Sequence, residues 1–199
     1  LFGEYAKINR GKIRLEGREI TVRNSREAMQ HGISLVPEDR KLHGLVLMQS
    51  ILRNISLANL DRFASFMRVD DLAELKESME FAQSLSIKAP NLHAAADSLS
   101  GGNQQKVVIS KWLMSRPKVL IMDDPTRGID VGTKYEIYKI MNDLSEKGIG
   151  IIMISSDLEE VLGMSDRIMV MCEDRSVTTL DISEATQEKI MALATGVAS

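Results

Sequence analysis

The chain has 199 residues, 44% of them hydrophobic and 27% charged, which suits one globular domain with a sizeable core. Its net charge is −3, with both signs mixed along the chain, so we expect no nucleic-acid partner, because nucleic-acid binders usually present a basic face. The single cysteine excludes an internal disulfide and a cysteine-based zinc cluster, and it fits a reducing cytosol.

The first predicted elements are a hairpin, a short helix and a strand. Apolar and polar residues alternate over residues 12–22 around Glu16-Gly17-Arg18, which is typical of a surface β-hairpin. Ser25 is predicted to cap a helix over residues 26–30 that ends at Gly32. A short strand follows at residues 33–36 and stops at Pro37.

The middle of the chain is predicted to be mostly helical. Helices are expected at residues 54–60 and 70–85, and the second carries a helical stripe that we expect to face the core, made of Leu72, Leu75, Met79, Ala82 and Leu85. Residues 45–97 interrupt the alternation of strands and helices, and they are interpreted as an inserted helical subdomain.

The remaining elements alternate between helix and strand. Helices are predicted at residues 103–114, 134–144, 158–162 and 184–194, and strands at residues 119–122, 149–154 and 167–171. Apolar strands that alternate with helices predict an α/β fold whose parallel sheet is covered on both faces.

Two acidic residues follow the apolar strand at residues 119–122. Asp123 would emerge at the carboxyl edge of the sheet, where open α/β folds bind ligands, and could hold Mg²⁺ directly or through water. Asp124 could orient or deprotonate an attacking water. The alternative reading is a strand that ends in a pair of helix-capping acids.

A second candidate site is the string Leu99-Ser100-Gly101-Gly102-Asn103-Gln104-Gln105-Lys106. Its two glycines allow a ligand to approach the backbone closely, and the N–H groups at a helix start favour an anion. The alternative is a glycine-containing helix cap. The string resembles the signature motif of ABC ATPases, and its Asn-Gln-Gln-Lys ending is similar to the version in importers of ribose, galactose and xylose.

The resemblance extends over most of the chain. Residues 123–132 resemble Walker B and the D-loop, in the form found in the second ATPase half of sugar importers. Residues 36–41 resemble the Q-loop region, residues 154–161 the switch region, and Leu1-Phe2-Gly3 the segment after the Walker A helix. The implied fold is a P-loop, RecA-like ABC ATPase core with a helical subdomain, over residues 1–199.

Three positions depart from the general ABC pattern. Glu38 replaces the Q-loop glutamine, Asp124 the catalytic glutamate, and Ser156 the switch histidine. The resemblance makes these three the candidate catalytic residues. The carboxylate of Asp124 would lie about 1.5 Å further back than that of a glutamate, and displacements of that size can cost on the order of 10²-fold in rate.

The resemblance also implies ligands and partners. Ser100, Gly101, Gly102 and Gln104 would contact ATP held by another nucleotide-binding half or a second ATPase copy, with Asp130 of the D-loop close by. The Q-loop region and the helical insert would contact a transmembrane permease at the cytoplasmic face of the cell membrane. A sugar-binding protein would take part indirectly.

A Walker A loop of the form Gly-x-x-x-x-Gly-Lys-Ser/Thr does not occur in the 199 residues. Its one Gly-Lys pair, Gly11-Lys12, is followed by Ile13 and has Ala6 at the earlier glycine position. We therefore expect the loop upstream of residue 1 in a longer parent protein, a fold that lacks the Walker A strand, loop and helix, and no useful ATP hydrolysis by these residues alone.

One alternative function stays open at this point. Some ABC-type ATPases are soluble and have no transporter, and such a module would have an interaction or regulatory role. The acidic composition and the Asn-Gln-Gln-Lys string weigh against it. Neighbouring genes for a permease and a sugar-binding protein would favour the importer.

Overall fold

The computed structural model describes residues 11–65 and 68–196, and the chain divides into two compact units between Ile152 and Met153. The expected match of Leu1-Phe2-Gly3 lies outside the described residues. Among those described, no helix is both long and apolar enough to cross a membrane.

The first unit begins with the predicted hairpin. Strands β1 (Ile13–Leu15) and β2 (Arg18–Ile20) pair antiparallel. Glu16 and Gly17 both have positive φ, which is the turn geometry that matches the twist of a two-residue hairpin. Helix α1 (Ser25–Gln30) follows, but Asn24 and not Ser25 caps it, because the Asn24 side chain accepts from the Glu27 amide.

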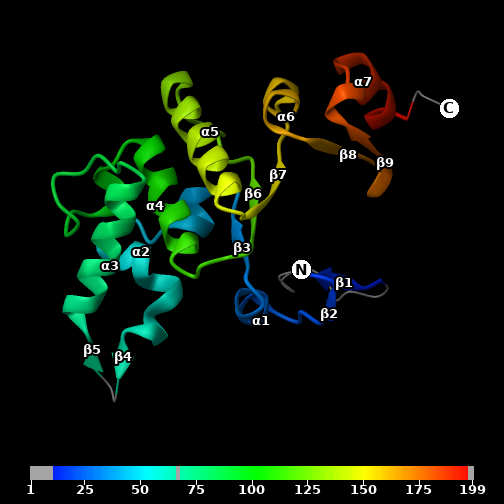
Figure 1. Cartoon of the computed structure of the whole chain (residues 1–199). Coiled ribbons are helices and arrows are strands. Elements are labelled where there is room, and N and C mark those ends of the chain that lie inside the picture. The colour runs from blue at the N-terminus through cyan, green and yellow to red at the C-terminus, as the bar shows by residue number, and fades with distance from the viewer. Residues whose placement is uncertain (1–10, 66–67, 197–199) are drawn as a thin grey trace. The chain divides into compact units, whose positions relative to one another are not determined.

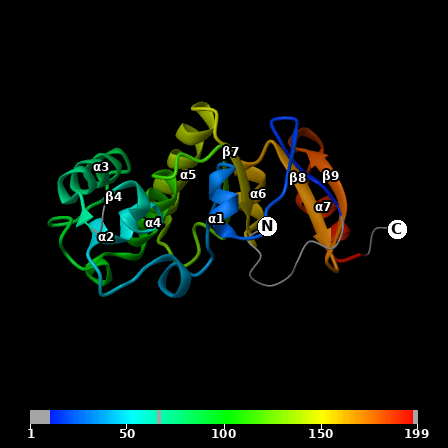
Figure 2. The same cartoon turned by 90° about the horizontal axis from the view of Figure 1, so that it is seen from below.

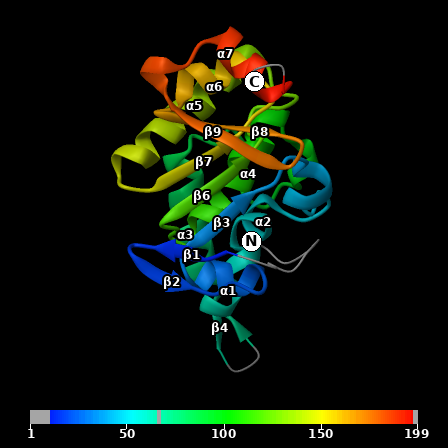
Figure 3. The same ribbon diagram turned by 90° about the vertical axis from the view of Figure 1, so that its right-hand side faces the viewer.

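The central sheet has the strand order β3-β6-β7. Strands β3 (Ile33–Val36) and β6 (Val119–Asp123) are parallel, as predicted, with Ile33 opposite Val119 and Val36 opposite Met122. Strand β7 (Gly150–Ile154) lies at the other edge of β6, and Figure 3 shows the three strands side by side. Ile152 and Ile154 are about half exposed, so this strand is less buried than its apolar sequence indicates. The exposure arises because, among the described residues, β7 is an edge strand and has a neighbouring strand on one side only.

The two faces of β3 and β6 have different coverings. Ile33 and Ile121 pack with Val22 and Ala28, from the hairpin end and α1. Helix α4 (Gly101–Leu113) packs on β3, and the Ser34 hydroxyl lies 2.9 Å from that of Ser115, just after this helix. Each face is therefore covered by helix.

Helices fill the middle segment, as expected. Helix α2 (Ile51–Ser56) begins three residues before the predicted start because Ser50 caps it, and it continues as a 3₁₀ helix over Leu57–Arg62. Strands β4 (Ala64–Ser65) and β5 (Arg68–Val69) form a short hairpin that was not predicted. Helices α2 and α3 (Asp71–Ser84) pack on each other and on α4 (Figures 1 and 2).

The buried face of α3 is only partly the one predicted. Leu72 is 80% exposed and Met79 is 42% exposed, whereas Ala82 and Leu85 are buried. The buried positions of the helix are Glu74, Ser78 and Ala82. Glu74 is buried because its carboxylate accepts from Arg53 Nη1 at 2.7 Å and from the Ser56 hydroxyl at 2.5 Å. A paired polar group has taken the place that apolar periodicity assigned to leucine.

A lysine is buried in the same region. Lys111 on α4 is 5% exposed, and its ammonium group donates to the carbonyl oxygen of Gly44. Burial lowers the pKa of Lys111 to about 8. The ammonium also lies 5.1 Å from the centre of the Trp112 ring.

Three α-helices and a hairpin follow in the described part of the chain. Helix α5 (Val131–Glu146) belongs to the first unit and begins three residues before the predicted start. The second unit holds α6 (Leu158–Met164), β8 (Arg167–Cys172), β9 (Arg175–Asp181) and α7 (Gln187–Ala194). Strands β8 and β9 pair antiparallel, and Ile168, Val170, Leu180 and Ile190 form the core of this unit.

The exchange of Glu74 for alanine tests the buried polar network of α3. Glu74→Ala should lower the free energy of unfolding by about 2–4 kcal/mol, because Arg53 and Ser56 lose their common acceptor. Leu72→Ala, on the exposed side of the same helix, should change it by less than about 0.5 kcal/mol. Urea unfolding followed by circular dichroism measures both. A larger effect at Leu72 than at Glu74 would restore the apolar stripe as the buried face.

The buried lysine predicts a pH dependence of stability. The folded-state pKa of Lys111, about 8, lies below its ordinary value of 10.5, so between these values the unfolded state binds more protons and the free energy of unfolding rises with pH. Relative to Lys111→Met, the native protein should gain on the order of 2 kcal/mol between pH 7 and pH 10. Urea unfolding of both proteins at the two pH values checks this, and parallel pH profiles would contradict it.

Candidate functional site

The acids predicted to bind metal lie at the carboxyl end of β6. Strands β3 and β6 are parallel, and Val36 pairs with Met122. Glu38 and Asp123 therefore both lie at the carboxyl edge of the sheet. The pKa of Asp123 is raised, mainly by burial and further by the neighbouring charge of Asp124. Asp124 has φ +39°, in the left-handed region, and its carbonyl accepts from the Arg127 amide at 3.0 Å. The strand therefore ends in a tight, strained turn that brings two carboxyl groups together.

These two acids could hold one cation, but not a complete metal cage. In the part of the chain that the structure describes, no three His, Cys, Asp or Glu side chains gather as metal ligands. Mg²⁺ needs less than that, because it is commonly bound by one or two carboxylates together with waters and the oxygens of a phosphate. A cation beside Asp123 and Asp124 would relieve the repulsion that raises the pKa of Asp123.

The glycine-rich string forms the start of α4. Ser100 is the N-cap residue, and helix α4 begins at Gly101, two residues before the predicted start. The Ser100 hydroxyl caps no backbone amide and instead accepts from the Asn103 side chain at 3.0 Å. The first-turn N–H groups of a helix have no acceptor within the helix, so this end can receive an anion.

Gln104, expected to contact ATP, lies inside the protein. Its side chain is 4% exposed, and its amide nitrogen donates to the carbonyl oxygen of Ala96 at 3.2 Å. The outward side of the helix start is formed by Ser100, which is exposed, and by the partly buried Gly101 and Asn103. The ligand role expected for Gln104 stays a prediction, and the structure assigns its side chain a supporting contact.

Both glycines of the string are in close contact with other motifs of the same chain. A Cβ at Gly101 would lie 2.7 Å from Arg40 Nη2, and one at Gly102 would lie 2.1 Å from Thr133 Cγ2. The second distance leaves no room for any side chain. Glycine is therefore required at Gly102 for packing within the chain, in addition to the ligand contact that the sequence indicates, whereas a Cβ at Gly101 would displace the end of the Arg40 side chain.

Two arginines join the Q-loop region to the D-loop. The carboxylate of Glu38 pairs with the guanidinium of Arg127. In return, Arg40 Nη1 donates to the carbonyl oxygen of Arg127 at 2.9 Å and Nη2 to that of Gly128 at 3.2 Å. Glu38 was predicted as a catalytic residue, and in the structure its charge is matched by Arg127.

Asp130, predicted near the nucleotide, caps α5. Its carboxylate accepts from the Thr133 hydroxyl at 2.7 Å and from the Thr133 amide at 3.0 Å. These hydrogen bonds, first that of the hydroxyl, lower the pKa of Asp130, which holds the group ionised. Because Thr133 also contacts Gly102, the cap ties the D-loop to the start of α4.

Ser156, the third residue predicted as catalytic, belongs to the second unit. It follows the end of β7, and its side chain is exposed. The adjacent Ser155 donates to the carboxylate of Glu160, which is 4% exposed, and Asp157 caps α6. The switch region is therefore a well-capped helix start.

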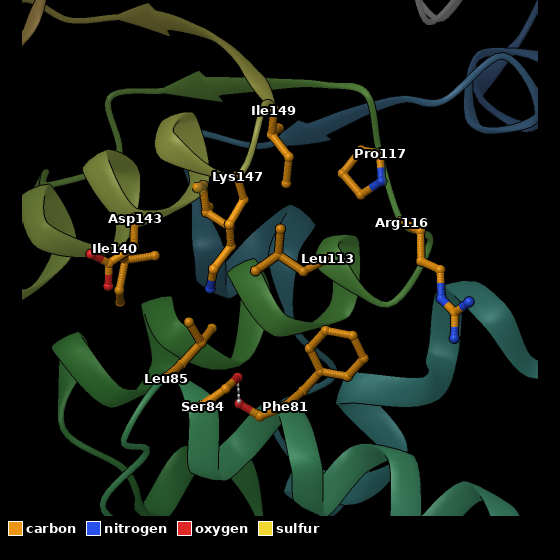
Figure 4. A pocket seen from close by; sticks show the side chains of 11 residues that line it. Phe81, Ser84, Leu85, Leu113, Arg116, Pro117, Ile140, Asp143, Lys147 and Ile149 are labelled. Carbon is orange, nitrogen blue, oxygen red and sulfur yellow. Dashed lines mark hydrogen bonds between the residues drawn. The ribbon is translucent and has the colours of Figure 1, made fainter.

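A pocket of about 350 Å³ lies away from these motifs. It is lined by the C-terminal ends of α3, α4 and α5, and Figure 4 shows Phe81, Leu85 and Leu113 at its wall. None of the predicted site residues lines it. The candidate site is thus the surface formed by the sheet edge and the start of α4, and not this cavity.

Sequence reasoning found the motifs but missed the residues that hold them together. No role was predicted from the sequence for Arg40, Arg127 or Thr133. Arg40 and Arg127 are 87 positions apart, so no local pattern reports their contact. The signal that could have found these contacts is charge. Glu38 and Arg40 lie in one motif, and Arg127 lies in the motif that was expected at the same edge of the sheet.

Comparison with known proteins places these motifs in a family. The sequence profile of the family described as ABC transporter matches residues 1–127. A xylose import ATP-binding protein of Geobacillus kaustophilus is 50% identical over 196 residues, which is 98% of this chain and 39% of that protein. A ribose import ATP-binding protein of Oceanobacillus iheyensis is 51% identical over 192 residues, 96% of this chain and 38% of that protein. The chain thus spans about two fifths of these relatives' length.

Solved structures agree with the fold. An ATP-binding cassette of an ABC transporter has a TM-score of 0.77 at 21% identity, with 98% of this chain and 81% of that chain covered. A Clostridium perfringens protein that is part of an ABC transporter complex has a TM-score of 0.73 at 23% identity, with 99% and 76% covered. The predicted α/β class and ABC-type core are confirmed, and the chain belongs to the ABC transporter family.

Proposed function

We propose that this chain is part of the ATP-hydrolysing subunit that energises carbohydrate import through an ABC transporter. The observation that carries the proposal is the joining of three motifs in one unit: the signature at the start of α4, the Asp123-Asp124 pair, and the D-loop between them, held by Arg40. The likeness to xylose and ribose import ATP-binding proteins supports a sugar as the cargo.

The signature would act on a nucleotide held by another ATPase half or a second copy. The backbone N–H groups at the start of α4 and the exposed Ser100 would bind the terminal phosphate, aided by the helix dipole. Gly101 and Gly102 allow this turn to approach the phosphate because no Cβ covers the backbone. The same glycines seat the turn against Arg40 and Thr133, so its donors are fixed before ATP arrives.

Asp123 and Asp124 would serve the nucleotide bound by this half itself. Asp123 would hold Mg²⁺, which supplies charge neutralisation at the phosphate oxygens when bound. Asp124 would orient the attacking water or accept its proton. Three features weaken this side: the shorter carboxylate of Asp124, the presence of Glu38 in place of glutamine, and Ser156 in place of a histidine that could carry charge.

The membrane partner would contact the segment after the Q-loop region. Leu42 is 76% exposed, Val46 45% and Met48 82%, and these three residues lie within seven positions of the chain. An exposed apolar group of this kind marks an interaction surface. We assign it to a transmembrane permease at the cytoplasmic face of the membrane, with a sugar-binding protein on the far side of that permease.

Two substitutions test whether the two composite sites are unequal. Ser100→Arg should abolish most ATPase activity of the full-length protein with its permease, because the arginine blocks the intact signature. Asp124→Asn should cost less than about tenfold, or about 1.4 kcal/mol in barrier, because the site on this side is already weak. Steady-state phosphate release measures both, and Ser176→Arg, at an exposed position of β9 in the second unit, is the matched control. Equal losses in Ser100→Arg and Asp124→Asn would show that the two sites are equivalent.

A further inference from the structure

The side chain of Arg40 lies where three motifs meet. Its two Nη atoms donate to the successive carbonyl oxygens of Arg127 and Gly128, at 2.9 and 3.2 Å. The same Nη2 lies against Gly101, where a Cβ would come within 2.7 Å of it. One guanidinium therefore contacts the D-loop turn and the first residue of the signature helix at once.

The backbone segment that contains Arg40 packs against a different part of helix α4. Residues Arg40–Gly44 form a single π-helical turn, capped by Asp39, whose carboxylate accepts from the amides of Lys41 and Leu42 at 2.8 and 3.0 Å. The turn ends at Gly44, which packs against Val108 of α4. A Cβ at Gly44 would lie 2.9 Å from Val108 Cγ2.

The buried ammonium of Lys111 holds the carbonyl oxygen of Gly44. Val108 and Lys111 lie two to three turns along α4 from Gly101, about 10–15 Å away. The π turn is thus tied to the far part of α4 through Gly44, and to its start through the Arg40 side chain.

The geometry of the guanidinium is specific to arginine. The Nε atom of Arg40 is buried and makes no hydrogen bond with the described residues, so its orientation is set by the two carbonyl contacts. A lysine ammonium can reach one of these oxygens, but it has no rigid fork to span both. The carbonyls belong to consecutive residues, so the fork also fixes the direction of the D-loop chain.

We propose that Arg40 is a positioning residue for ATP hydrolysis, which holds the Arg127–Gly128 turn against the start of the signature helix. It keeps the signature donors and the D-loop at one fixed spacing when a nucleotide is bound across the two ATPase halves. The role rests on the proposed function, since spacing matters only if a nucleotide binds there. It acts on the transition state more than on ATP affinity, because Arg40 is assigned no contact with the nucleotide.

The experiment compares Arg40→Met, Arg40→Lys and Lys189→Met in the full-length protein with its membrane subunits. Lys189 is the matched control, because its Nζ also donates to a carbonyl oxygen, that of Glu184 at 3.2 Å, and it lies on α7, outside the motifs and the helical insert. Steady-state phosphate release gives kcat and KM for ATP. Hydrogen exchange without nucleotide follows the Arg127 amide, which donates to Asp124 O, and the Gln104 amide, which donates to Ser100 O in the first turn of α4.

Arg40→Met should lower kcat roughly 10- to 100-fold, with KM for ATP changed less than about threefold. It should speed exchange at Arg127 and Gln104 while α2 and α3 stay protected. Arg40→Lys should lie between Arg40→Met and the native protein in both measurements. Lys189→Met should leave kcat and the exchange at these residues as in the native protein.

Unchanged kcat or unchanged exchange in Arg40→Met would overturn the proposal, as would Arg40→Lys equal to the native protein, or an equal loss of kcat in Lys189→Met. A native protein without ATPase activity would instead refute the proposed function. In that case the positioning role is refuted as a role in hydrolysis, and the exchange measurement still decides whether Arg40 holds the turn.

Discussion

The absence of side chains at Gly101 and Gly102 is the constraint on which the arrangement of the motifs depends. Gly102 backs directly onto Thr133, whose hydroxyl and amide bind the Asp130 carboxylate, and Gly101 backs onto the guanidinium of Arg40. Any larger residue at Gly102 would push α4 away from α5. The start of α4, the D-loop and the Q-loop region would then lose their mutual register.

This constraint gives the signature string two functions. A glycine pair at a helix start is usually read as a means of bringing a phosphate close to the backbone. Here the inner side of the same turn is equally crowded, by Arg40 and Thr133. A change in the inward packing would therefore also move the outward donors. This coupling accounts for the length of the string, eight residues, that identifies the sequence.

The sequence predicted those parts of the fold whose burial is apolar and continuous. Strands β3 and β6 were found because four consecutive residues of each are largely apolar, and the hairpin at Glu16-Gly17 because its turn contains glycine. The hairpin β8–β9 was missed since its turn residues, Glu173 and Asp174, take positive φ without a glycine. Leu72 and Met79 were wrongly placed on the buried face of α3 because a buried carboxylate with two partners leaves no apolar signal.

For the candidate site, the sequence identified the motifs and not the bonds between them. Local strings indicated Asp123, Asp124, Ser100 and Asp130, each of which lies at the end of a strand or the start of a helix. The contacts of Glu38 and Arg40 join residues almost ninety positions apart. Tertiary structure alone brings them together, and a string search has no access to it.

The distance along the chain between β3 and β6 has a consequence for the order of folding. Ile33 pairs with Val119, whereas the network of the helical segment joins Arg53, Ser56 and Glu74 within 21 positions. Contacts between near neighbours form faster than those that close long loops. The helical segment can therefore assemble while the chain is still open, and the edge that gathers Glu38, Arg40 and the D-loop closes last. A nascent chain would complete its helical segment before the sheet edge that carries the candidate site exists.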